Sequence, residues 1–210
     1  MVKIGIGSDR TCHDWKSLLS SYEKHVTPDS VVLEIGASNT KRTKDLSRLC
    51  RRLIGIEIAP ERVPEDFDNV TYLVGDWQRL SEIVDADSVD LAVSSHVLEH
   101  VPDDLRAVNE LHTVLKPGGI GLINTPNRKR VLRALVESFT GERKFPYWEH
   151  QREYAEEDLV SLLERSRFQR YQILPVAFGL LGGPVYVYSE TVPERLRKYA
   201  NFWEMHLFKR

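Results

Sequence analysis

The sequence predicts an α/β fold with a doubly wound, mostly parallel sheet. Short β-branched runs alternate with segments of helical periodicity, which is typical of a parallel sheet with helices on both faces. The first two runs each deliver a carboxylate, Glu34 and Glu57, and a glycine turn follows the first. Open parallel sheets use such positions, at the carboxyl ends of their strands, for ligand binding.

The elements follow in order along the chain. We expect a first helix over residues 13–25, because Trp15, Leu18, Leu19 and Tyr22 form one apolar stripe ahead of a Thr-Pro-Asp turn. Parallel strands are expected near residues 31–35, 53–58, 70–74, 90–95 and 119–124. Further helices are expected near residues 41–51, 78–85, 103–115, 129–138 and 156–166. The chain closes with strands near 170–177 and 203–209 and a short helix near 192–199.

Size and charge limit the class of protein. With 210 residues and 41% hydrophobic content, residues 1–210 fit one domain with a substantial core. The formal net charge is −2, so nucleic acid is not expected as a partner. Basic clusters occur at residues 41–52 and 128–133, and both are interpreted as solvated faces of helices.

Cysteine usage and hydropathy indicate the compartment. The two cysteines, Cys12 and Cys50, show neither CxxC nor His-Cys spacing, so no metal site is predicted and a reducing, cytoplasmic setting is expected. The start lacks the features of a signal peptide. Residues 171–189 are uncharged but interrupted by Pro and Gly, whereas a transmembrane helix needs about 20 steadily apolar residues. No transmembrane segment is predicted, and the oligomeric state stays open.

Five motifs in a fixed order carry a resemblance to a known family. They are VVLEIGASNT, RLIGIEIAP, GDW, VLEHVPD and LKPGGIGLINTPN. Together they resemble the class I S-adenosylmethionine-dependent methyltransferases, in particular the small-molecule, type 11-like branch. The resemblance spans about residues 28–126 and, more loosely, 150–168. It implies a Rossmann-like, seven-stranded sheet that ends in an antiparallel hairpin formed by the two late strands.

The resemblance implies S-adenosyl-L-methionine as cofactor. The turn at Gly36 is expected to meet the methionine amino group, with Glu34 ordering the loop. Glu57 has the acceptor geometry for both ribose hydroxyls, and Asp76 can accept the adenine amino proton. The implied cofactor-binding residues are Glu34, Gly36, Ala37, Ser38, Glu57, Ile58, Asp76, Trp77, Ser94, Ser95 and His96.

The glycine turn departs from the family pattern. Ser38 and Thr40 stand where the family usually has further glycines. NAD requires a G-x-G-x-x-G turn for its pyrophosphate, so the departure counts against NAD. It matters less for S-adenosylmethionine, which has no phosphate.

Methyl transfer needs mainly positioning of two reactants. A general base is needed only for a weakly acidic acceptor, and the candidate catalytic residues are His96, His150 and Tyr154. His150 and Tyr154 have an alternative reading as polar anchors of a loop. No metal ligand is assigned.

The acceptor is expected to be a small or lipid-like molecule. Residues 127–154 exceed the 2–6 residues usual for such a connection, and they carry aromatic side chains. We expect this segment to cap the acceptor, with Tyr147, Trp148 and His150 lining its pocket. Two alternatives stay open: an RNA or protein methyltransferase that uses the basic clusters, and a non-catalytic protein that binds the cofactor or only a partner.

Overall fold

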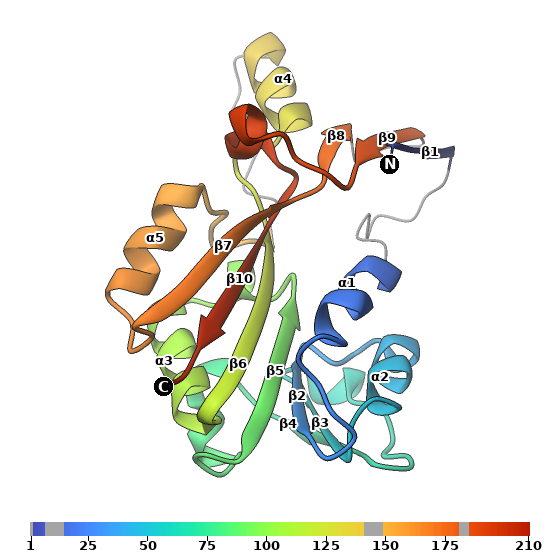
Figure 1. Cartoon of the computed structure of the whole chain (residues 1–210), viewed down its shortest axis with the longest axis vertical. Helices are drawn as coiled ribbons and strands as arrows, with labels where there is room; N and C mark the ends of the chain where they lie inside the picture. The colour runs from blue at the N-terminus through green and yellow to red at the C-terminus, as the bar shows by residue number, and fades with distance from the viewer. Residues whose placement is uncertain (1, 7–14, 141–148, 181–184) are drawn as a thin grey trace.

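A seven-stranded sheet forms the centre of the computed structural model, which describes residues 2–6, 15–140, 149–180 and 185–210 (Figure 1). The strands lie in the order β4-β3-β2-β5-β6-β10-β7. Their bounds are β2 (Val31–Ile35), β3 (Arg52–Glu57), β4 (Val70–Val74), β5 (Val89–Ser95), β6 (Leu115–Pro126), β7 (Arg170–Val176) and β10 (Phe202–Phe208). Strands β2 to β6 pair in parallel. The chain winds outward from β2 in both directions, so β2 and β5 form the switch point where such sheets bind ligands.

The helices appear close to the residues where the periodicity predicts them, but those expected near 78–85 and 192–199 are 3₁₀ segments. The α-helices are α1 (Trp15–Tyr22), α2 (Thr40–Ser47), α3 (Asp104–Val114), α4 (Val131–Thr140) and α5 (Glu156–Glu164). The helix expected at 78–85 is a 3₁₀ segment, Trp77–Glu82, because Asp76 caps the N–H of Gln78 and Arg79 leaves helical geometry at φ −139°, ψ 32°. Shorter 3₁₀ turns occupy Pro60–Arg62, Leu98–His100 and Glu194–Tyr199.

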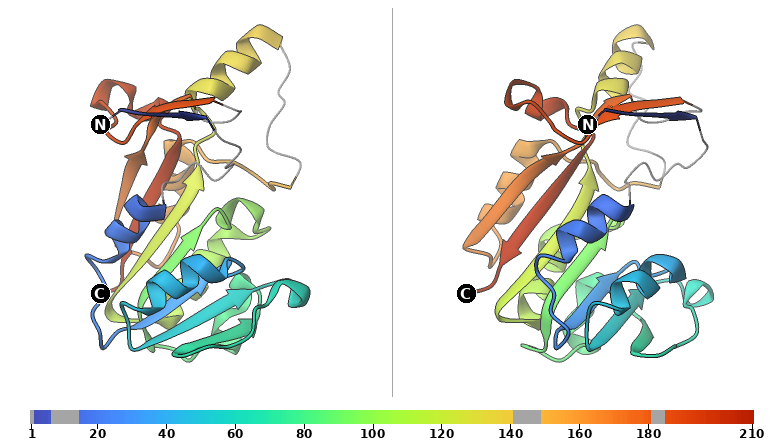
Figure 2. Two further views of the ribbon diagram at one scale, coloured as in Figure 1. Left: turned by 90° about the vertical axis from the view of Figure 1, so that its right-hand side faces the viewer. Right: turned by 45° about the vertical axis from the view of Figure 1, so that its right-hand side comes forward.

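Helices cover both faces of the sheet, as the doubly wound prediction requires (Figure 2). Neighbouring residues of β2 point to opposite sides. Val32 belongs to a buried cluster with Leu18 of α1 and Leu46 of α2, whereas Leu33 belongs to the cluster that contains Leu111 of α3. Both faces of the strand are therefore inaccessible to water, which explains its continuous apolar run.

The last two strands of the sheet run antiparallel to their neighbours. β10 pairs with both β6 and β7, so that Met205 lies opposite Ile123 on one side and Ile173 on the other. The predicted mostly parallel seven-stranded sheet with an antiparallel C-terminal pair is confirmed. The two strands are not joined by a tight turn, because further elements lie between them in the chain.

A second, three-stranded antiparallel sheet was not predicted. It consists of β1 (Val2–Ile6), β9 (Val185–Ser189) and β8 (Phe178–Leu180), in the order β1-β9-β8. Helix α4 contacts β8, and the two lie beyond the carboxyl ends of the parallel strands (Figures 1 and 2). We expected residues 127–154 alone to cover the carboxyl ends of the strands. In the structure, β1 from the start of the chain and β8 and β9 from its last third also lie in this region.

The predicted cap is only partly described. Tyr147 and Trp148 lie outside the described residues, so the acceptor pocket that we expect there stays a prediction. None of the helices in the described ranges is long and apolar enough to cross a membrane.

Candidate active site

A cavity of about 540 Å³ opens at the carboxyl ends of β2, β3, β4 and β5. Small-molecule and cofactor sites commonly measure about 300–1,000 Å³ and lie at such a switch point. The predicted residues among its walls are Gly36, Ser38, Glu57, Ile58, Asp76, Trp77, Ser95 and His96. Glu34 and Ser94 line a smaller hollow of about 50 Å³, which shares Gly36 and Ser95 with the cavity.

The turn after β2 is shaped by Gly36. Its φ is +81°, a left-handed conformation, and its N–H donates to the carbonyl of Ile56 at 2.8 Å. A Cβ at this position would lie 2.5 Å from Cγ2 of Val97. Conformation and space therefore both favour glycine, and the turn presents its backbone to the cavity. Ala37 is fully buried beneath the turn and lines neither hollow.

Glu34 lies behind this turn with its carboxylate out of water. Burial raises the pKa of Glu34 to about 7, against the opposing effects of Thr43 and Arg42. Its Oε2 accepts no hydrogen bond from any residue that the structure describes. The turn is therefore backed by a carboxyl group that is costly to ionise in the absence of a cation.

Glu57 and Asp76 hold acceptor oxygens on the opposite wall. Glu57 is 7% exposed, and its Oε1 accepts the N–H of Ala59 at 3.2 Å. A carboxylate offers about four acceptor positions, so Glu57 keeps capacity for two hydroxyl donors. Asp76 lines the cavity and also caps the following turn, accepting from the backbone and side-chain nitrogens of Gln78. Ile58 is 66% exposed, which leaves an apolar surface for a ring.

His96 follows β5 in an uncommon backbone conformation. Its φ is +58°, and its N–H donates to the carbonyl of Asn124 at 3.0 Å. The ring packs edge-on against Phe202, with 5.2 Å between centroids, and Nδ1 lies 3.3 Å from Oε1 of Glu99. Non-glycine residues held at positive φ often mark functional sites. The ring is one-third exposed and lines the cavity.

A segment distant in sequence brings His150 to this wall. The N–H of Gln151 donates to the carbonyl of Glu99 at 2.9 Å, and Nδ1 of His100 lies 2.9 Å from the carbonyl oxygen of Glu149. The rings of His100 and His150 then meet edge to face at 4.7 Å. His100, which lines the cavity, was not among the predicted site residues, and no spacing in the sequence indicates this pairing.

Tyr154 lies in the core and does not line the cavity. It is 3% exposed, and its hydroxyl donates to Oδ2 of Asp104 at 3.0 Å. Burial, and then the charge of Asp104, raise the pKa of Tyr154 far above its usual value of 10. This geometry favours the alternative reading of Tyr154 as an anchor and argues against a role as a base.

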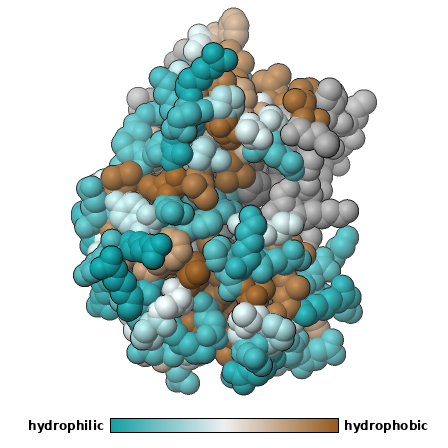
Figure 3. Space-filling view, viewed as in Figure 1, coloured by the Kyte–Doolittle hydropathy of each residue, from teal (hydrophilic) through white to brown (hydrophobic). Residues whose placement is uncertain are grey.

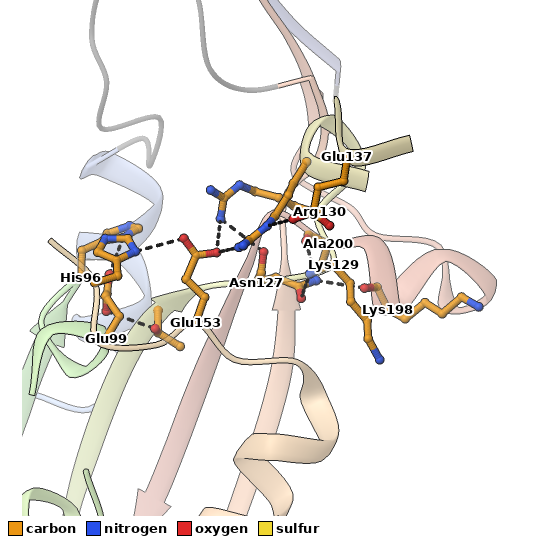
Figure 4. A network of polar contacts seen from close by, with 12 residues as sticks. His96, Glu99, Asn127, Lys129, Arg130, Glu137, Glu153, Lys198 and Ala200 are labelled. Carbon is orange, nitrogen blue, oxygen red and sulfur yellow. Dashed lines mark hydrogen bonds and ion pairs between the residues drawn. The ribbon is translucent and has the colours of Figure 1, made fainter. Parts of the chain in front are cut away.

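Glu153 is the centre of a buried ionic network that sequence reasoning missed. Arg130 and Arg133 pair with one of its oxygens, and Nδ1 of His150 lies 3.0 Å from the other (Figure 4). Burial alone would raise the pKa of Glu153, but the hydrogen bond with His150 and the two guanidinium charges outweigh it and hold the pKa below its usual value. The network therefore connects Arg130 and Arg133, near the start of the predicted cap, to His150 near its end.

The sequence matches known families and proteins. The family described as "Methyltransferase domain" matches residues 33–123. A probable S-adenosylmethionine-dependent methyltransferase of Mycolicibacterium smegmatis is 32% identical over 152 residues, which are 70% of this chain and 55% of that protein. A ubiquinone biosynthesis O-methyltransferase of Xanthomonas campestris is 30% identical over 116 residues, 52% of this chain and 48% of its own length. The chain thus spans about half the length of these curated relatives.

Solved structures share the fold. A SAM-dependent methyltransferase of Thermotoga maritima superposes with a TM-score of 0.64 at 21% identity, covering 93% of this chain and 89% of its own. The YcgJ protein of Bacillus subtilis gives a TM-score of 0.66 at 16% identity, covering 94% and 99%.

The fold and the cavity define a Rossmann-like domain with a ligand site at its switch point. The sequence matches assign residues 33–123 to the methyltransferase-domain family, and similar proteins of Mycolicibacterium smegmatis and Thermotoga maritima are named as S-adenosylmethionine-dependent methyltransferases.

Proposed function

We propose that this protein transfers a methyl group from S-adenosylmethionine to a small or lipid-like molecule by in-line displacement. The observation that carries the proposal is the cavity at the switch point, where a left-handed glycine turn faces two strand-end carboxylates. These features match the needs of a cofactor with an ammonium group, two ribose hydroxyls and an adenine amino group.

The residues present fit the cofactor. Glu57 would hold the ribose hydroxyls, and Asp76, with the backbone of Trp77, would hold the adenine edge. The turn at Gly36, backed by Glu34, would receive the methionine end, together with Ser94 and Ser95. When bound, S-adenosylmethionine supplies a methyl group already activated by its positive sulfur.

The protein's contribution to the transfer is positioning. Holding two reactants in line can supply about 7–11 kcal/mol of the barrier, so no covalent role is needed from a side chain. His96 lines the cavity after β5, where the acceptor would meet the methyl group, and His150 packs against His100, another lining residue. Either imidazole could take the proton of a hydroxyl acceptor.

The relatives support an oxygen acceptor on a small molecule. Several are named as ubiquinone biosynthesis O-methyltransferases, at about 30% identity over half of this chain. We therefore propose a hydroxyl group as the acceptor, bound beneath residues 127–154 and near residues 178–188. An RNA or protein acceptor remains the alternative, with the basic clusters as its contact surface.

Calorimetric titration tests the cofactor step. S-adenosylhomocysteine should bind to one site per chain, while NAD and NADP should give no heat of binding. Binding of NAD without a response to S-adenosylhomocysteine would overturn the proposal. Transfer of a radiolabelled methyl group to a panel of phenols and polar lipids, with RNA and protein as competing acceptors, then tests the acceptor class.

A further inference from the structure

Glu99, His100 and His150 form a cluster of which the proposed methyl transfer uses only His150, as one of two candidate bases. As a metal ligand, His150 would leave that role to His96. One ligand atom from each lies within 4.8 Å of those from the other two. Glu99 and His100 belong to the 3₁₀ turn after β5, and His150 comes from the segment that docks on this turn. Two imidazoles and one carboxylate are the donor set of many catalytic zinc and non-haem iron sites.

The carboxylate of Glu99 is buried with one oxygen available. Its side chain has no exposed surface, and Oε2 accepts the hydroxyl of Thr125 at 3.1 Å. Oε1 receives no hydrogen bond of acceptable geometry from the described residues, although Nδ1 of His96 lies 3.3 Å away. A buried carboxylate oxygen without a donor is costly, and a cation would satisfy it.

Both histidines are oriented as metal ligands usually are. Metal-bound imidazoles almost always give their second ring nitrogen to a carbonyl or a carboxylate, which fixes the ring. Nδ1 of His100 is 2.9 Å from the carbonyl oxygen of Glu149, and Nδ1 of His150 is 3.0 Å from a carboxylate oxygen of Glu153. Each ring would then offer Nε2 to an ion. Figure 4 shows the Glu153 carboxylate between His96 and Arg130. The carboxylate that orients His150 therefore lies close to Glu99 and His96.

We propose that Glu99, His100 and His150 bind a divalent transition-metal ion, of the zinc, manganese or iron class, at the wall of the cavity. Ligand atoms at about 2.1 Å from one ion lie roughly 3–3.5 Å apart, so the cluster needs only a small contraction of the side chains to close on it. Three protein ligands leave at least one position open, and His100 lines the cavity into which that position would face.

The site would select the acceptor, and this consequence rests on the proposed methyl transfer. A metal ion lowers the pKa of a bound hydroxyl, so an acceptor oxygen held there would lose its proton to water. The oxygen's electron pair would form the bond to the methyl carbon while the carbon–sulfur bond breaks and its electrons return to sulfur. The site therefore favours acceptors with a hydroxyl, above all one beside a second oxygen.

Metal binding can be measured without turnover. The full chain, treated with a chelator and dialysed, is titrated by calorimetry with Zn²⁺ and separately with Mg²⁺. We expect one Zn²⁺ per chain, and binding of Mg²⁺ at least 100-fold weaker, because Mg²⁺ prefers oxygen ligands. His100→Ala and His150→Ala should each weaken Zn²⁺ binding at least tenfold, while His25→Ala, a histidine between α1 and β2, should leave it unchanged.

Two outcomes would overturn the metal site. One is the absence of stoichiometric Zn²⁺ binding, and the other is an affinity that neither histidine variant changes. Glu99→Gln provides a third test if its melting temperature shows an intact fold. Binding of S-adenosylhomocysteine to the metal-free protein is measured alongside: if it persists while Zn²⁺ fails to bind, only the metal site is refuted, and if it is absent while Zn²⁺ binds, the proposed function fails instead.

Discussion

Cofactor affinity should depend most on the carboxylate of Glu57. It is buried at the end of β3 and keeps acceptor capacity toward the cavity. We expect Glu57→Ala to weaken S-adenosylhomocysteine binding by about 1–3 kcal/mol, the cost of removing a charged acceptor from hydroxyl donors. Asp76→Ala should cost less, because Gln78 already occupies part of that carboxylate.

Calorimetry of folded variants measures both effects. Glu61→Ala is the matched control, because this exposed glutamate follows four residues later and lies outside the cavity walls. An unchanged affinity in Glu57→Ala would mean that the acid after the second predicted strand has been misassigned.

Gly36 and Gly118 allow backbone strain to be separated from steric collision. Both have φ of +81°, but a Cβ at Gly118 meets nothing within 4 Å, whereas one at Gly36 would lie 2.5 Å from Val97. Gly118→Ala should therefore cost about 1–2 kcal/mol of unfolding free energy, the strain of a left-handed residue. Gly36→Ala should cost roughly a further 1–3 kcal/mol through overpacking.

Urea unfolding of the two variants gives the difference. Val97→Ala added to Gly36→Ala should recover most of the steric part, since it removes the colliding methyl group. Equal costs at the two glycines would contradict the close contact of the turn with Val97.

Glu34 should make stability depend on pH. Its pKa rises from 4.5 to about 7 on folding because the carboxyl group is buried. Between these pH values the folded protein keeps a proton that the unfolded chain has released, so stability is lost as pH rises through this window. Glu34→Gln cannot ionise, and its unfolding free energy relative to wild type should increase by about 1–3 kcal/mol from pH 5 to pH 8.

Urea unfolding at several pH values measures this change. Glu23→Gln, an exposed carboxylate on the chain before β2, is the control and should show a difference that does not vary with pH. A flat difference for Glu34→Gln would mean that water or a cation reaches its carboxylate.

At the residue scale, the sequence predicted those site residues whose position depends only on the neighbouring sequence. Glu57 and Asp76 could be predicted because each directly follows a short β-branched run, and parallel strands bring their carboxyl ends to one edge. The pairing of His150 with Glu99 and His100 could not, because it depends on how a distant segment docks, through hydrogen bonds of its backbone.

Among the elements, the seven strands of the large sheet could be predicted because their apolar runs are bounded by turn residues. The small sheet could not. β8 has only three residues, and β1, although Val2, Ile4 and Ile6 alternate with Lys3 and Gly5, has only five and pairs with a strand at the far end of the chain. The 3₁₀ segment at Trp77–Glu82 looked helical because periodicity does not distinguish it from the first turns of an α-helix.

Removal of β1 should loosen the small sheet and spare the large one. β1 pairs along its whole length with β9, from Val2 opposite Ser189 to Ile6 opposite Val185. Without residues 2–6, β9 keeps only β8 as a partner, and an isolated pair of strands is marginally stable. Amide hydrogen exchange in β8 and β9 should accelerate, while exchange in β2 and β5 and the melting temperature should change little. Loss of protection in β2 would show that the two sheets unfold together.

For the whole molecule, one group of exposed apolar side chains lies on α4 and β8. Phe139 and Leu135 of α4 are 87% and 45% exposed, and Leu180 of β8 is 46% exposed. Figure 3 shows brown residues in the upper part of the visible face, near these elements, and further brown residues in its lower part. This surface lies on the side expected for the acceptor, and it is consistent with a lipid-like molecule as substrate.

The pairing of β1 with β9 also has a consequence for how the chain folds. Strands β2 to β5 can find their partners within short stretches of sequence, whereas β1 must wait for a strand almost the full length of the chain away. Contacts of such high sequence separation form slowly, because the entropy cost of closing a large loop precedes the favourable contact energy. The small sheet should therefore assemble last in refolding, so that the parallel strands of the large sheet are complete before the region beyond their carboxyl ends takes shape.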